Sequence, residues 1–170
     1  MILNNSINAG NFIYCMANWT PNEFNTYYNA GHGHYHQAAY VVDGWGVAEI
    51  RETIDGPVIK SDGTKRPGEL IDLIPTKNMY HTTTTKESSL TMIMFNPIPD
   101  SRELDIEIVK GPITKTVTAV DKRITIVCIT GPITANNKSI ESLQHAKIFP
   151  GKTAELLLSE GTVCALVSDK

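Results

Sequence analysis

Short runs of apolar residues, rich in valine, isoleucine, threonine and aromatic side chains, follow one another along most of the chain. β-Branched and aromatic side chains fit a pleated sheet, so these runs predict β-strands. Helical periodicity is nearly absent, and the best candidates for helices are residues 21–28 and 139–143. The predicted strands cover residues 12–16, 34–42, 47–51, 70–74, 80–85, 90–95, 104–109, 114–120, 124–129, 146–149, 154–158 and 163–167.

Turn-forming residues separate these runs. Pairs such as Asp62-Gly63 predict tight turns, and Asn136-Asn137 predicts a hairpin bend. The tetrapeptide Gly-Pro-Ile-Thr occurs at 111–114 and again at 131–134, which indicates two similar turns that lead into strands. Many short strands at regular spacing are typical of a β-sandwich or β-barrel, so the expected fold class is all-β.

Composition and charge exclude several classes of partner. The chain has 170 residues and a net charge of −3, with no stripe of basic residues that would bind a nucleic acid. Its longest apolar runs, such as residues 92–95, are too short to span a bilayer, and the asparagine-rich start does not resemble a secretory signal. The three cysteines, Cys15, Cys128 and Cys164, are widely spaced among apolar neighbours. They are expected to be buried, reduced thiols, which suits a cytoplasmic protein.

The strongest signal of chemistry is a group of alternating histidines, His32, His34 and His36, with Gln37 next to it. Neutral imidazole is the commonest metal ligand in proteins. Side chains at i, i+2 and i+4 of an extended strand point the same way, so the group predicts one half of a metal site.

These residues resemble the first motif of the cupin superfamily, which joins a His-x-His pair to a further ligand and, after six more residues, a glycine. Here Gln37 is followed by six residues and Gly44, and the stretch 40–44 is similar to the end of that motif. The second motif supplies a histidine after a proline turn, and His81 follows Pro75 in a similar way. The resemblance implies a cupin jelly-roll barrel, and a compact bicupin with unequal halves is one form of it.

Two ligand sets are compatible with this resemblance. The first is His32, His34, Gln37 and His81, with the loop before Gln37 shorter than is usual in the family. The second replaces Gln37 by His36 and follows strict strand alternation. Either set leaves a divalent transition metal, Fe, Mn, Zn or Ni, with its full charge, because no ligand is a carboxylate. Such an ion polarises a substrate oxygen or a bound water strongly.

The later part of the chain resembles a second, degenerate cupin-like half. It contains a strand and a Gly131 turn but no His-x-His pair. The expected organisation is therefore a barrel with the metal site in residues 1–100 and a smaller half without metal ligands, packed on it, in residues 101–170. The alternative is one larger sandwich that residues 101–170 complete.

Other polar and aromatic residues near the motif have open roles. Glu49 and Arg51 share one face of a predicted strand, where they either line the mouth of the barrel or form an exposed pair. Tyr35, Tyr40 and Tyr80 flank the predicted ligands and are expected in the core. A phenol next to a metal can also act as a general acid or base.

Two functional hypotheses follow from the resemblance. The first is a small metalloenzyme of isomerase, lyase or dioxygenase type that acts on a polar small molecule. The second is a non-catalytic cupin-fold protein with a structural, assembly or ligand-binding role and a vestigial site. Cupin barrels often pair through their strands, so the resemblance also implies self-association, with a small molecule as the other expected partner.

Overall fold

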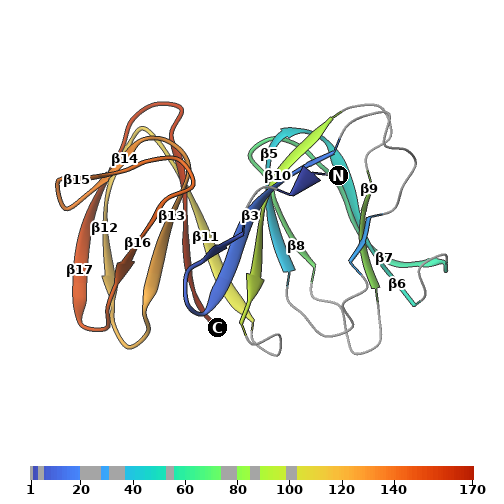
Figure 1. Ribbon diagram of the computed structural model, residues 1–170, viewed down its shortest axis with the longest axis horizontal. Helices are drawn as coiled ribbons and strands as arrows, with labels where there is room; N and C mark the ends of the chain where they lie inside the picture. The colour runs from blue at the N-terminus through green and yellow to red at the C-terminus, as the bar shows by residue number, and fades with distance from the viewer. Residues whose placement is uncertain are drawn as a thin grey trace. The chain divides into compact units, whose positions relative to one another are not determined.

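The computed structural model describes residues 2–3, 6–19, 28–30, 37–52, 56–73, 80–84, 89–98 and 103–170. The chain forms two compact units, Met1–Arg102 and Glu103–Lys170. Every regular element among the described residues is a β-strand, which confirms the all-β prediction (Figure 1). No helix that could cross a membrane occurs in these parts of the chain.

The first unit contains two antiparallel sheets. One has the order β1-β3-β10-β5-β8, with β2 paired to β3, and the other has the order β4-β9-β6-β7. The strands of the first sheet are β1 (Ile2–Leu3), β2 (Ile7–Asn8), β3 (Phe12–Trp19), β5 (Gln37–Gly44), β8 (Leu70–Leu73) and β10 (Leu90–Pro97). The strands of the second are β4 (Tyr28–Ala30), β6 (Gly46–Arg51), β7 (Val58–Lys65) and β9 (Tyr80–Thr84).

One face of the β3-β10-β5-β8 sheet supplies most of the first hydrophobic cluster. Val41 lies opposite Met92, and Ala39 lies opposite both Met94 and Ile71, so these residues share a face. They are all buried in the same cluster, which also includes Ile50 of β6 in the other sheet. The strict alternation along β5 therefore decides which of its residues face this core.

The alternate positions of the same sheet are also buried. Phe12, Tyr14 and Phe95 are fully buried and their rings lie 6.1 to 6.5 Å apart, as tilted pairs. Tyr40 belongs to this face, since it lies between Ala39 and Val41 on β5 and opposite Ile93. Burial of both faces explains why β10 is almost continuously apolar in sequence.

The second unit contains two four-stranded antiparallel sheets, with the orders β11-β18-β13-β16 and β12-β17-β14-β15. The strands of the first are β11 (Leu104–Lys110), β18 (Val163–Asp169), β13 (Ile124–Thr130) and β16 (His145–Ile148). The strands of the second are β12 (Ile113–Ala119), β17 (Lys152–Leu158), β14 (Ile133–Ala135) and β15 (Lys138–Ile140). Both Gly-Pro-Ile-Thr turns carry the chain from the first of these sheets to the second, at β11–β12 and β13–β14, as two similar turns that enter strands.

Both sheets of the second unit contribute to one hydrophobic cluster. Its members come from β13 and β18, such as Ile126 and Leu166, and from β17, such as Leu156. Cys128 and Cys164 lie opposite each other in the β13–β18 ladder and are both free and fully buried. Burial raises the pKa of Cys128 to about 11 and that of Cys164 to about 12, so both thiols are neutral at physiological pH.

All the predicted strands are found, with ends that differ by a few residues, except that residues 34–36, 74 and 85 lie outside the described residues. The predicted helix at residues 139–143 is wrong. Asn136 and Asn137 have φ of 46° and 61°, the backbone of a type I′ turn, and they close the predicted hairpin between β14 and β15 instead. Of the other helix candidate, residues 21–27 lie outside the described residues, and Tyr28 begins β4.

Asp62-Gly63 is not a turn between strands, as its sequence predicts, but lies inside β7. Ala48 pairs with Gly63 whereas Glu49 pairs with Ser61, so Asp62 is the extra residue of a β-bulge. Gly63 has φ of 72°, and glycine adopts that conformation without strain. The strand is mostly polar and exposed because β7 is at the edge of its sheet. It therefore lacks the long apolar run from which a strand is predicted.

Gly44, the glycine of the predicted motif, ends β5 in a conformation that only glycine accepts easily. Its φ is 76°, and a Cβ atom there would overlap the backbone oxygen of Ser89. Gly44 also pairs with Leu90, the first residue of β10. The glycine therefore allows β5 and the start of β10 to approach each other closely.

We expect Gly44→Ala to lower the free energy of unfolding by about 3 kcal/mol, because it adds backbone overlap to the 1–2 kcal/mol of left-handed strain. The matched control is Gly63→Ala. Gly63 has nearly the same φ but open space around it, so this change carries the strain alone and costs about 1 kcal/mol. Urea unfolding of both variants measures the difference, and equal losses would show that the overlap with Ser89 has no effect.

Candidate metal site

The predicted ligands fall on two segments that lie only partly in the described residues. His32, His34 and His36 lie outside them. The backbones of Gln37 and His81 are described: Gln37 begins β5, and His81 is the second residue of β9. Neither ligand set is tested directly by the structure, and both remain predictions.

The strand registers bring the described ends of these two segments together. Ala30, the last residue of β4, is the Cα partner of His81. Gln37, the first residue of β5, is the Cα partner of Leu73, the last residue of β8. Segments 31–36 and 74–79 therefore both connect the same end of one sheet to the same end of the other.

Register also relates Gln37 and His81 to the core. Gln37 precedes Ala39 by two residues and Val41 by four, and both of these belong to the hydrophobic cluster of the first unit. His81 lies opposite Ile50, a third member of that cluster. Alternate residues of a strand and directly opposed residues of an antiparallel pair belong to the same sheet face, so both positions are on the core side of their sheets.

Glu49 and Arg51 lie on the other side of β6. They flank Ile50, which faces the core, so they do not line the interior of the barrel. Nor are they an exposed pair, since their side chains are only 18% and 13% exposed. Arg51 donates from Nη2 to Glu49 Oε2 at 2.7 Å and from Nη1 to the backbone oxygen of Gly56 at 2.6 Å, which gives the pair a structural role.

Tyr40 is buried as predicted, but on the face of β5 opposite to Ala39 and Val41. Burial raises the pKa of the Tyr40 phenol, so it is neutral at physiological pH. It is therefore not placed to act on a ligand held at the core side of Gln37. Tyr35 lies outside the described residues.

The structure describes the second unit without a gap, from residue 103 to residue 170. No group of three histidine, cysteine, aspartate or glutamate side chains that could hold a metal ion occurs among its residues. Its one histidine, His145, begins β16 opposite Val127. Burial, and secondarily the charge of Lys147, lowers the pKa of His145.

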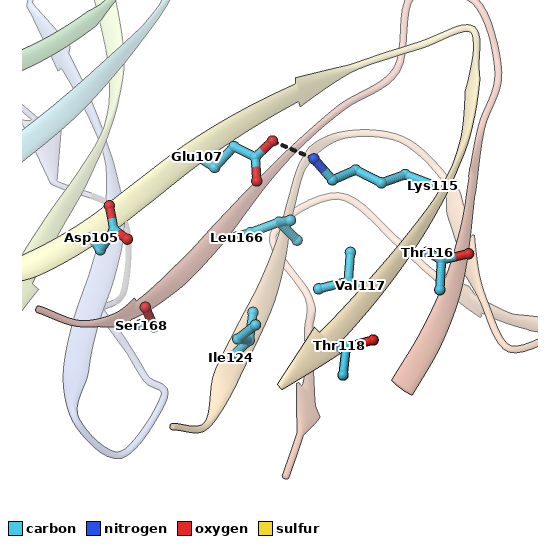
Figure 2. Close-up of a pocket in the computed structure, with 9 residues that line it drawn as sticks. All are labelled: Asp105, Glu107, Lys115, Thr116, Val117, Thr118, Ile124, Leu166 and Ser168. Carbon is cyan, nitrogen blue, oxygen red and sulfur yellow. Dashed lines mark hydrogen bonds and ion pairs between the residues drawn. The ribbon is translucent and has the colours of Figure 1, made fainter. Parts of the chain in front are cut away.

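A cavity of about 270 Å³ in the second unit was not predicted from the sequence. Asp105 and Glu107 on β11 are among the residues that line it (Figure 2). They alternate with the apolar residues of β11, and that alternation was the signal in the sequence. In the sequence alone, the same alternation is equally typical of a strand with one face exposed to solvent.

No protein-family model matches the chain, and no curated protein matches it significantly in sequence. Solved structures do match. YhhW from Escherichia coli has a TM-score of 0.65 with 10% identity, over 96% of this chain and 93% of its own. YhaK from the same organism has a TM-score of 0.63 with 11% identity, over 94% and 86%. A mutant of oxalate decarboxylase OxdC from Bacillus subtilis has a TM-score of 0.59 with 8% identity, over 95% and 69%.

These neighbours are cupin-fold proteins. The chain therefore has the cupin jelly-roll fold, which confirms the resemblance found in the sequence at the level of the fold. At such low identities the likeness concerns the fold alone, because one fold carries many unrelated functions.

The lowered pKa of His145 predicts a dependence of stability on pH. As the pH falls through about 6.5, the unfolded chain takes up a proton at this position before the folded chain does. Stability should therefore decrease below that pH, and the loss should be complete below the folded pKa. His145→Gln should reduce this loss, as measured by urea unfolding at about pH 7.5 and about pH 5.5. An identical pH dependence of stability in the wild type and in His145→Gln would contradict the lowered pKa of His145.

Proposed function

We propose that this protein is a cupin-fold metalloprotein whose first unit holds one divalent transition metal and acts as a small enzyme on a polar small molecule. The observation that carries the proposal is the pairing of Ala30 with His81 and of Gln37 with Leu73. It supports a single site, because the predicted ligand segments connect the same strand ends of the same two sheets.

Covalent geometry limits how far apart the predicted ligands can be. Consecutive Cα atoms are about 3.8 Å apart, so the Cα of His32 lies within about 7.6 Å of Ala30, the partner of His81. Gln37 and His81 are both on the core side of their sheets. The register thus supports Gln37 and His81 as members of one site, and we propose that His32 and His34 complete it. His36 in place of Gln37 is the alternative that the experiment below separates.

The donor chemistry fits a borderline transition metal. Imidazole suits Fe, Zn and Ni, and an amide oxygen also suits Mn. With no carboxylate among the ligands, the ion would keep its full charge and would polarise a substrate oxygen or a bound water. The residues of this chain would hold that ion at the end of a barrel lined by apolar side chains such as Val41 and Met92, which exclude water.

Enzyme activity of isomerase, lyase or dioxygenase type is the function that we infer for this site. One of the fold neighbours is, by its name, an oxalate decarboxylase, so the fold supports catalysis in at least one other protein. We also propose that the protein self-associates and works in the cytoplasm. The three buried, free cysteines support a reducing compartment.

The second candidate function is a non-catalytic cupin-fold protein with a vestigial site. The observation that favours it is the second unit, which keeps the two-sheet architecture without any cluster of metal-binding side chains among residues 103–170. The two-sheet architecture of the second unit is therefore built without such a cluster. The two candidates differ in whether the first unit binds a metal at all.

Metal analysis of the purified full chain tests the proposal. We expect about one transition metal per chain by elemental analysis, removable by a chelator and restored by titration. His34→Ala and His81→Ala should each lower the affinity by more than the 10- to 100-fold that loss of an outer-shell group costs. Gln37→Ala and His36→Ala separate the two ligand sets, because only the variant that loses a ligand should lose metal.

His145→Ala is the matched control, since this histidine belongs to the second unit and should leave the metal content unchanged. Circular dichroism verifies that each variant keeps its fold. Wild-type protein that neither contains a transition metal nor binds one on titration would rule out the metalloenzyme and favour the second candidate. Metal retained by both His34→Ala and His81→Ala would show that the site lies elsewhere.

A further inference from the structure

The cavity of the second unit lies beside two strands that are each at the edge of a sheet. β11 is the edge of one sheet and β12 is the edge of the other. Asp105 and Glu107 reach the cavity from β11, and Lys115 reaches it from β12. The site is thus separate from the predicted ligands of the first unit and belongs to residues 103–170 alone.

Apolar side chains form the middle of this cavity. Val117 and Leu166 are 6% exposed and belong to the core of the unit, and Ile124 packs against that core. Figure 2 shows Leu166 and Val117 below the Glu107–Lys115 pair, with Ile124 further below and Asp105 apart from that pair. An aliphatic group placed over them would be removed from water, which is favourable in proportion to its area.

The charges around the cavity favour a cation. Lys115 forms an ion pair with Glu107, so the charges of these two groups largely cancel. Asp105 is left as the remaining carboxylate, and its Cα partner Ser168 also lines the cavity and carries a hydroxyl. A ligand ammonium group would meet a carboxylate and a hydroxyl there, both of which can accept its hydrogen bonds.

The same lining disfavours other classes of ligand. No aromatic side chain lines the cavity, so a nucleobase would find no ring to stack on. An anion would meet the Asp105 carboxylate and would have to compete with Glu107 for Lys115. The volume of about 270 Å³ is slightly below the usual range of about 300–1,000 Å³ for ligand pockets, which limits the ligand to a small molecule.

We propose that this cavity is a binding site for a small aliphatic amine, with its ammonium group at Asp105 and Ser168 and its hydrocarbon part over Val117, Ile124 and Leu166. This site goes beyond the proposed metal function and does not depend on it. A chain without metal in the first unit would still bind the amine in the second.

Nuclear magnetic resonance of the full chain with methyl labelling tests the site, with n-butylamine, n-butanol and butyrate as probes. Butylammonium should shift the methyl signals of Ile124, Leu166 and Val117 in a saturable way, with a Kd on the order of 1 mM for so small a ligand. Butanol, which has the same hydrocarbon part and no charge, should bind at least tenfold more weakly. Butyrate should not bind. Added salt should weaken the binding of butylammonium but not that of butanol.

Asp105→Asn removes the charge and keeps the shape of the side chain. It should reduce the affinity for butylammonium to that for butanol. The matched control is Asp121→Asn, an exposed aspartate of the same unit that does not line the cavity, and it should leave the affinity unchanged. Unchanged methyl signals in the absence of ligand verify that both variants keep their fold.

Three results would overturn the proposal. The first is the absence of saturable shifts at butylammonium concentrations well above the expected Kd. The second is an equal loss of affinity in Asp105→Asn and Asp121→Asn, which would mean a general effect of charge. The third is stronger binding of butyrate than of butylammonium, which would make Lys115 the anchor of an anion site.

Discussion

The ladder between β5 and β10 is the constraint on which the first unit depends. It sets Val41 against Met92 and Ala39 against Met94, and this register decides which face of β5 belongs to the core. A slip of one residue would exchange the two faces and turn Tyr40 toward the core cluster. The same alternation along β5 places Gln37 on the sheet face of Ala39 and Val41. The position of His81 depends instead on the separate ladders that β9 forms with β4 and β6 in the other sheet.

Much of the fold could be predicted because most strands are apolar enough to be recognised by composition. The polar edge strand β7 could not, since its Asp62-Gly63 bulge resembles a turn in sequence. The helix predicted at residues 139–143 is wrong because the Asn136-Asn137 turn places the residues that follow it in strand β15, paired with β14. For the candidate site, the sequence predicts the types of ligand, and this remains a prediction. The pairing of Ala30 with His81 depends on contacts between distant segments, which no local pattern contains.

The two units share a two-sheet architecture, and the functions proposed for them differ in chemistry. In the first, the predicted ligands are neutral imidazoles and an amide, and they suit a borderline transition metal. In the second, the open side of the barrel carries carboxylates, hydroxyls and one lysine over an apolar base, which suits an organic cation better than a metal. In the second unit the polar residues lie along the edge strands β11 and β12, while the core residues of each unit stay apolar.

Gly44 has a consequence for tracing the descent of such proteins. Its role is to let the backbone of Ser89 pass close by, and that role is independent of any metal. A descendant that lost its histidines would still be under selection to keep this glycine, since losing it would destabilise the first unit by about 3 kcal/mol. The glycine of the motif therefore indicates the architecture, and only the histidines bear on whether such a protein can bind a metal.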